Sequence, residues 1–248
     1  MSAQAAPASG QPGLADVLAR SDVWRGDALA QAPLPGVPTG FGELDTELPG
    51  GGWPRGGLVE LLPERRGIGE MALLMPALAL ISAEELAWVV CVAPPLPPYA
   101  PAWAAAGVSL SRLLVTRAAG GDAAWACARA LDADGVGALV AWLPAADATT
   151  LRRLQLLAEK SRTLIFLFRP AAAAQESSPA PLRIALAASR AAAGRLSLNL
   201  LKRRGGARAM PLELDLARPA PLPSVSHVVA GTAPTAAPAR SLSQPAAA

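Results

Sequence analysis

The chain is poor in lysine and histidine, the side chains that often bind phosphates or transfer protons in enzymes. Its 248 residues include only two lysines, Lys160 and Lys202, and neither follows a glycine-rich loop. No lysine is therefore placed to bind nucleotide phosphates in such a loop. The single histidine, His227, stands alone in a tail rich in small residues and is no candidate for a general base.

Cysteines and long apolar runs are also scarce. Cys91 and Cys127 each stand among apolar residues, which predicts small core residues and neither a disulfide framework nor a metal site. The longest apolar run, residues 71–81, is interrupted by Pro76 and is shorter than the roughly 20 residues that span a bilayer. Because no basic residue precedes Arg20 and no continuous apolar segment lies there, we expect no signal peptide and a cytoplasmic protein.

The composition indicates one folded domain with tails. Hydrophobic residues make up 52% of the chain, enough for one sizeable core. The net charge of +3 comes almost wholly from arginine and permits an acidic partner without requiring one. We predict disordered tails at residues 1–13 and 219–248, an N-terminal segment or linker at 14–38, and the domain at 39–218.

Short apolar runs alternate with helical stretches, which indicates βαβ units and an α/β fold with a mostly parallel sheet. Strands are expected near residues 58–62, 88–93, 113–116, 138–143 and 164–168, and helices near 71–86, 101–106, 123–132 and 148–161. Three later runs, near residues 182–187, 195–201 and 211–216, predict antiparallel strands at one edge, since leucines alternate with polar residues in the second of them. Asp147 should cap the helix 148–161, and Pro76 should kink the helix 71–86 or delay its start.

The loop after the first strand has the position of a phosphate-binding P-loop but lacks its chemistry. It consists of Pro63, Glu64, Arg65, Arg66, Gly67, Ile68, Gly69, Glu70 and Met71. A P-loop needs a lysine for the phosphates and a hydroxyl for magnesium. With Gly69 as the preceding glycine, these positions hold Glu70 and Met71, and a carboxylate there would repel a triphosphate. We therefore expect a degenerate nucleotide site with no cofactor and no metal, in which Gly67, Gly69 and Glu70 serve loop shape, partner docking and a favourable charge at a helix N-terminus.

The residues around this loop resemble a known family. A TG…LD turn at residues 39–45, a glycine-rich run at 50–57 and the strand that follows are similar to the entry of RecA-type recombinases. Further segments match the ImuA family, in that family's order: residues 23–26, 49–53, 67–70, 73–78, 92–95, 99–102, 142–144, 151–156, 166–170 and 200–206. Residues 23–216 thus resemble ImuA, a RecA-like accessory protein of damage-induced translesion DNA synthesis.

This resemblance implies a RecA-like core without ATPase activity. In its frame, the two carboxylates that an ATPase needs fall near Pro94 and Trp142, and neither side chain can activate water or hold magnesium. Arg169 falls where such proteins place a polar sensor of the γ-phosphate. We therefore expect a protein that is not an enzyme, which leaves an active recombinase-like ATPase as the disfavoured alternative.

The remaining candidates are interaction residues. Lys202, Arg203 and Arg204 follow a predicted strand and would either contact phosphates or form a solvated hairpin tip. Arg65 and Arg66 lie in the degenerate loop, where they would bind a ligand or merely close the sheet. Trp24 and Arg25 belong to an N-terminal segment that would dock onto a neighbour or pack in the core.

By resemblance to ImuA, the implied function is a scaffold in SOS mutagenesis. Its partners would be the ImuB-like inactive Y-family polymerase homologue, an error-prone C-family DNA polymerase and, as a further candidate, RecA. DNA would be contacted directly or through these partners, and no membrane is implied. The alternative is a cell-division inhibitor of the SulA type, also a RecA-like remnant, which binds the tubulin-like division protein.

Overall fold

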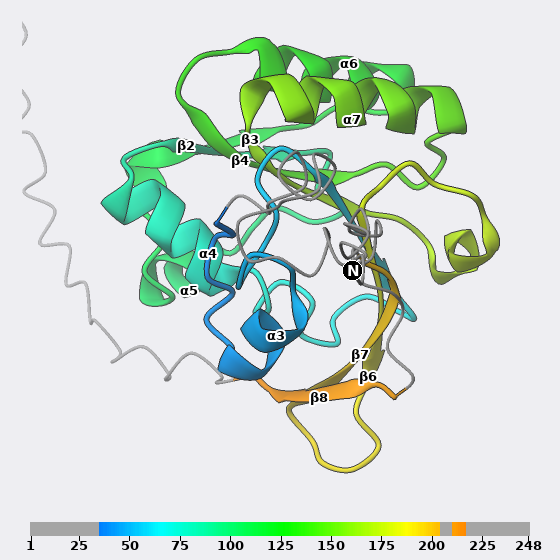
Figure 1. The fold of residues 1–248 in the computed structure, drawn as a ribbon. Helices are drawn as coiled ribbons and strands as arrows, with labels where there is room; N and C mark the ends of the chain where they lie inside the picture. The colour runs from blue at the N-terminus through cyan, green and yellow to red at the C-terminus, as the bar shows by residue number, and fades with distance from the viewer. Residues whose placement is uncertain (1–34, 204–209, 217–248) are drawn as a thin grey trace, which may run out of the picture.

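The computed structural model describes residues 35–203 and 210–216, which form a mixed eight-stranded sheet with helices on both faces (Figure 1). The strand order is β3-β2-β4-β5-β1-β6-β7-β8. The strands are β1 (Leu58–Pro63), β2 (Trp88–Val92), β3 (Leu113–Thr116), β4 (Val136–Trp142), β5 (Leu164–Phe168), β6 (Leu182–Ala188), β7 (Arg195–Lys202) and β8 (Leu212–Asp215). The predicted α/β class and mostly parallel sheet are confirmed, and the arrangement is consistent with a Rossmann-like or RecA-like fold.

The three later strands pair antiparallel with one another, as expected, but the first of them also joins the parallel part of the sheet. β6 pairs in parallel with β1, whereas β7 is antiparallel to both β6 and β8. Among the described strands, β7 alone therefore runs against the others. The sequence pattern could not reveal this, because an alternation of period two reports one covered face of a strand and not the direction of its neighbour.

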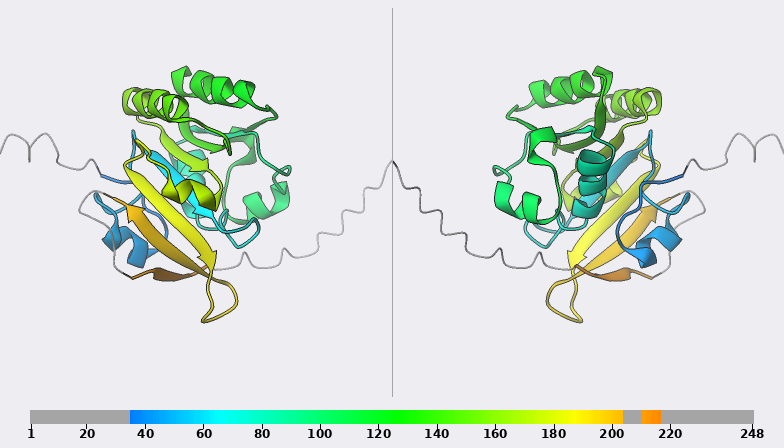
Figure 2. Two further views of the ribbon diagram at one scale, coloured as in Figure 1. Left: turned by 90° about the vertical axis from the view of Figure 1, so that its right-hand side faces the viewer. Right: turned by 90° about the vertical axis from the view of Figure 1, so that its left-hand side faces the viewer.

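The helices form two layers. On one face α6 (Gly121–Asp132) and α7 (Ala148–Ser161) lie side by side above β1, β2 and β4. The other helical segments are α3 (Gly42–Glu47), α4 (Met75–Ala79), the π-helical turn η1 (Leu80–Glu84), α5 (Ala100–Ala105), and the 3-10 turns η2 (Leu110–Arg112) and η3 (Ala171–Gln175). Figure 2 shows the α6–α7 layer at one side of the molecule and the turn between β6 and β7 projecting at the opposite end.

Both faces of the central strands are buried, as expected for parallel strands covered by helices. One apolar cluster contains Val59, Leu61 and Phe166, and the other contains Leu58, Leu139 and Leu167. Because neighbouring residues of a strand point to opposite faces, each strand contributes to both clusters.

Cys91 and Cys127 lie in opposite clusters, which confirms that both are core residues. Burial raises the pKa of each thiol to about 12, since a thiolate would be poorly solvated there. Neither thiol is therefore activated as a nucleophile at neutral pH.

The helix expected at residues 71–86 begins later than its apolar run. α4 starts at Met75, so Pro76 occupies the second helical position, and residues 71–74 form turns. Proline is tolerated in the first turn of a helix, because the backbone N–H that it lacks would have no intrahelical partner there. The predicted delay caused by Pro76 is confirmed.

The N-terminal edge of the described chain packs into the core. The backbones of Val37 and Trp53 exchange two hydrogen bonds, with N···O distances of 2.8 and 2.7 Å. Val37 is 3% exposed, and Trp53 is completely buried. The packed chain therefore includes at least two residues before position 39, where the domain was expected to start.

The predicted cap of α7 is confirmed. An Asp147 carboxylate oxygen accepts a hydrogen bond from the Thr150 backbone N–H at 2.8 Å. At the sheet-facing side of the helix, the Gln155 side-chain oxygen accepts a hydrogen bond from the Leu58 backbone N–H at 2.9 Å. The helix is thus fixed both at its N-terminus and against the start of β1.

This cap predicts a pH-dependent contribution to stability. Hydrogen bonds from the Thr150 backbone and hydroxyl hold the pKa of Asp147 below the ordinary aspartate value. A lowered folded-state pKa means that the contribution is complete above about pH 4 and is lost as the pH falls through that lowered pKa. We expect Asp147→Ala to lower the melting temperature at pH 7 but to differ less from wild type at pH 2.5, by circular dichroism. Asp147→Asn, which caps without a charge, should lie between them at pH 7, and a difference independent of pH would contradict this account.

Candidate functional site

The loop after β1 closes on its own carboxylate. One oxygen of Glu70 accepts the backbone N–H of Gly67 at 2.9 Å. Its other oxygen accepts the N–H groups of Ile68 at 2.9 Å and Gly69 at 3.1 Å. Successive backbone N–H groups that converge in this way form an anion-binding nest. In this chain the anion in the nest is the side chain of Glu70.

Glycine provides the loop with conformations that other residues adopt poorly. Gly67 and Gly69 have φ values of 78° and 105°, in the region that L side chains rarely enter. A Cβ atom on Gly69 would also lie 2.6 Å from a methyl carbon of Leu216. The expected role of the glycines in loop shape therefore has a physical basis at both positions.

The expectation that Glu70 lies at a helix N-terminus is wrong. α4 begins at Met75, five residues later, so the Glu70 charge does not act on the first turn of that helix. Its carboxylate binds the loop's own N–H groups instead. The sequence did not reveal this contact, because it depends on the backbone bending back between residues 67 and 70.

A cleft of about 650 Å³ lies beside the loop, at the carboxyl ends of β2 and β4. In α/β sheets this is the usual place for a ligand. The lining residues are mostly small and apolar, and they are Arg66, Ala93, Pro95, Ala118, Ala119, Gly120, Gly121, Ala123, Ala124, Trp142, Leu143, Pro144, Ala145, Ala146, Asp147 and Thr150. The only ionisable side chains among them are Arg66 and Asp147, and Asp147 caps α7.

The structure brings together the positions at which the resemblance places catalytic carboxylates. Trp142 lines the cleft, and the neighbours of Pro94, Ala93 and Pro95, line it as well. The Trp142 ring stacks on Phe168, with ring centroids 5.0 Å apart and planes at 13°. These positions thus contribute an aromatic wall and a proline-rich rim, neither of which supplies a base or a metal ligand.

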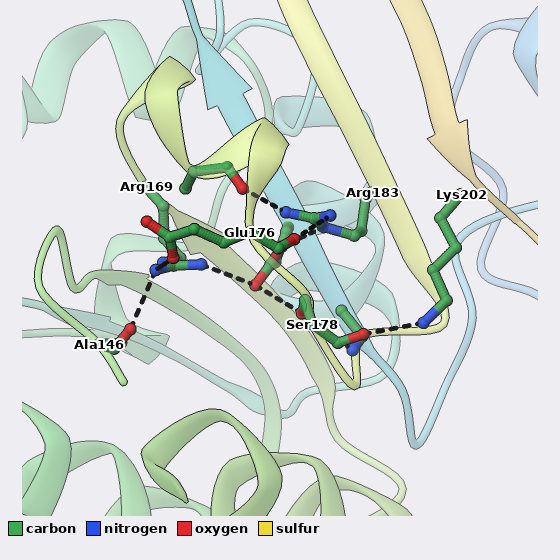
Figure 3. A network of polar contacts seen from close by, with 9 residues as sticks. Ala146, Arg169, Glu176, Ser178, Arg183 and Lys202 are labelled. Atoms are coloured by element: carbon green, nitrogen blue, oxygen red, sulfur yellow. Dashed lines mark hydrogen bonds and ion pairs between the residues drawn. The ribbon is translucent and has the colours of Figure 1, made fainter. Parts of the chain in front are cut away.

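Arg169, expected at the position of a phosphate sensor, is bound within a buried polar network (Figure 3). Its guanidinium lies 3.4 Å from a Glu60 carboxylate oxygen and 2.7 Å from a Glu176 carboxylate oxygen. It also donates to the Ala146 carbonyl oxygen at 3.0 Å. The Arg169 side chain is 3% exposed, so its charge is directed at these partners and away from solvent.

Glu60 is the centre of this network. It is completely buried in β1 and faces Arg183, its register partner on β6, with the Arg183 Nε atom 2.6 Å from the carboxylate. The Ser178 hydroxyl donates to the other Glu60 oxygen at 2.8 Å. Two arginines therefore surround the Glu60 carboxylate, and the partly exposed Glu176 balances the second positive charge.

Sequence reasoning missed Glu60 and Arg183 as a pair. The available signal was a single charge in each of two otherwise apolar strands, since a buried charge requires an opposite partner. A charge in a buried strand implies that a partner exists, but it does not say which strand carries that partner. The order of the strands in the sheet supplies this information.

The other predicted interaction residues differ in their surroundings. Arg65 and Arg66 are both exposed, but they line different clefts. Arg65 lies beside the β6–β7 turn, with its Nε atom 3.8 Å from a Glu64 carboxylate oxygen. Arg66 lies in the cleft that Trp142 also lines. Lys202 donates to the Ser178 carbonyl oxygen at 2.9 Å, and Arg203 lies 2.8 Å from a Glu47 carboxylate oxygen.

These contacts direct Lys202 and Arg203 toward the protein itself, which differs from both alternatives, a phosphate-contacting turn and a solvated hairpin tip. Arg204, Trp24 and Arg25 lie outside the described residues, as do the predicted tails.

Within residues 35–203 and 210–216, no three His, Cys, Asp or Glu side chains lie close enough to hold a metal ion. In the same ranges no helix has the length and apolarity needed to cross a bilayer. In comparisons with known proteins, no family model matches the chain and no curated protein is significantly similar to it.

Proposed function

We propose that this protein is a RecA-like scaffold that binds no nucleotide and serves damage-induced translesion DNA synthesis. The observation that supports it best is the Glu70 carboxylate in the nest of the loop after β1. In a functional P-loop, N–H groups of this kind bind nucleotide phosphates. A bound triphosphate would have to displace Glu70 and then lie beside its negative charge.

The surroundings of the loop support the same proposal. The adjacent cleft offers a triphosphate only Arg66 as a cation, and its Trp142 cannot ligate magnesium. Phosphoryl transfer depends on positioned cations and on a residue that orients the attacking water. A protein with this cleft is therefore better suited to bind another protein than to hydrolyse ATP.

The proposed partners follow the resemblance to ImuA. They are an ImuB-like polymerase homologue, an error-prone C-family polymerase and, as a further candidate, RecA, with DNA reached directly or through them. Copurification of the full chain from DNA-damaged cells tests this assignment. Recovery of these polymerase partners supports the proposal, whereas recovery of the tubulin-like division protein in their place would favour the SulA-like alternative.

The absence of nucleotide binding is a separate prediction. We expect the full-length protein to show no saturable binding of a fluorescent ATP analogue at micromolar concentrations, and no phosphate release with single-stranded DNA. Glu70→Ala should remain without ATPase activity, because the lysine, the hydroxyl and both carboxylates are still missing.

The same variant tests the nest itself. Glu70→Ala should lower the free energy of unfolding by about 1–2 kcal/mol, since three N–H groups lose a charged acceptor. Glu43→Ala, at an exposed site on α3, is the matched control and should change the free energy little. ATP binding by the wild-type protein that is lost in Arg66→Ala would refute the proposal.

A further inference from the structure

The cleft beside Trp142 combines a mostly apolar lining with an unpaired arginine side chain. Arg66 makes no hydrogen bond or ion pair with any residue in the described ranges, although it lies at the cleft. The other ionisable group there, Asp147, already accepts the N–H of Thr150. The cleft thus holds one cation and one anion, and Arg66 is the one of the two that has no partner among the described residues.

The start of α6 also lies at the cleft. Gly120 and Gly121 begin the helix and line the cleft, and no side chain caps this end. The free N–H groups of a helix N-terminus carry a partial positive charge. The first turn of α6 contains Asp122, and Asp147 caps α7, so a carboxylate lies at both helix starts and Arg66 is the only cationic side chain of the lining.

The remaining surface suits an apolar group. Most of the lining side chains belong to alanine, glycine and proline, and Trp142 is held in place by its stacking on Phe168. A volume of about 650 Å³ accommodates a few side chains of a peptide. Nucleic acid would instead be expected to meet several cations along its backbone.

We propose that this cleft binds an acidic, apolar peptide segment of a protein partner. An apolar side chain of the segment contacts Trp142 and the alanines, and a neighbouring carboxylate pairs with Arg66. This inference rests on the proposed function, since a cleft that held a nucleotide would have no room for the segment. The cleft at the usual ligand position of an α/β sheet would then recognise a protein partner in place of a small molecule.

The experiment uses Arg65 and Arg66, adjacent cations that line different clefts. A random peptide library displayed on phage is selected on the immobilised full-length protein, and the enriched peptides are synthesised. Their affinities are measured by fluorescence anisotropy for wild type, Arg66→Glu and Arg65→Glu. We expect peptides with Asp or Glu next to Leu, Ile or Phe, and a loss of affinity of roughly 10- to 100-fold in Arg66→Glu alone.

Two further variants separate the parts of the site. Arg66→Lys keeps the charge and should retain most of the affinity, whereas Ala124→Leu fills the apolar part of the cleft and should weaken binding without changing the charge. Unchanged melting temperatures would show that all four variants are folded.

Three outcomes would overturn the inference: no enrichment of peptides, enriched peptides without acidic residues, or equal losses in Arg65→Glu and Arg66→Glu. Selective binding of a single-stranded oligonucleotide through Arg66 would also overturn it, in favour of a nucleic-acid site. ATP binding by the wild-type protein is a different result, which refutes the proposed function itself.

Discussion

Replacing Glu60 by alanine is expected to lower the free energy of unfolding by about 3–5 kcal/mol. The change leaves Arg169 and Arg183 buried, with side chains 3% and 8% exposed, and without the carboxylate that both face. An uncompensated charge in a protein interior is far more costly than the loss of an exposed ion pair. Chemical denaturation followed by circular dichroism measures the effect.

Two controls distinguish the destabilisation caused by an unpaired buried charge from the stabilisation that an ion pair itself contributes. Arg129→Ala removes an exposed pair with Asp132 and should cost less than about 1 kcal/mol. The triple change Glu60→Leu, Arg169→Leu and Arg183→Met removes all three buried charges, and it should recover most of the stability that Glu60→Ala loses. If Glu60→Ala cost no more than Arg129→Ala, the buried network would have no special role in stability.

Replacing Trp53 by alanine is also expected to destabilise the fold by about 3–5 kcal/mol. The Trp53 side chain is completely buried, and its ring meets Phe166 edge to face at 5.1 Å between centroids. Its backbone also binds Val37, so the side chain anchors the first described residues against the central strands. Removal of the indole therefore leaves a large cavity at the point where this segment joins the core.

Trp53→Phe is the matched variant, and it should lose clearly less stability than Trp53→Ala. Phenylalanine retains most of the buried area, and the Trp53 Nε1 atom has no hydrogen-bond partner among the described residues. The substitution therefore sacrifices no hydrogen bond. Equal losses in the two variants, measured by thermal denaturation, would contradict the cavity account, because phenylalanine fills most of the volume that alanine leaves empty.

The sequence predicted the strands well because their signals are local. Apolar runs such as the one ending at Pro63 were sufficient to place β1 to β5, and Asp147 marked the start of α7. The helix was expected to begin at residue 71 because the apolar run begins there. Residues 71–74 are apolar but form turns, and the first helical residue is Met75.

The candidate site was predictable in its composition and not in its contacts. The sequence indicated that residues 63–71 lack P-loop chemistry, and it could not indicate that Glu70 would bind the backbone of its own loop. The separation of Arg65 from Arg66 was equally hidden, because adjacent exposed residues differ only in the direction of their side chains. Contacts of this kind depend on three-dimensional positions that no periodicity encodes.

The central place of β1 in the sheet also has a consequence for synthesis of the chain. β1 is complete about one hundred residues before its neighbours β5 and β6 begin. At roughly 5–20 residues per second, the ribosome exposes this apolar strand for about 5–20 s before a native partner exists. Glu60 interrupts the apolar run throughout that interval, and a charge within such a run hinders aggregation. The carboxylate that joins two arginines in the folded protein is thus also the one charge within this strand before its neighbours are made.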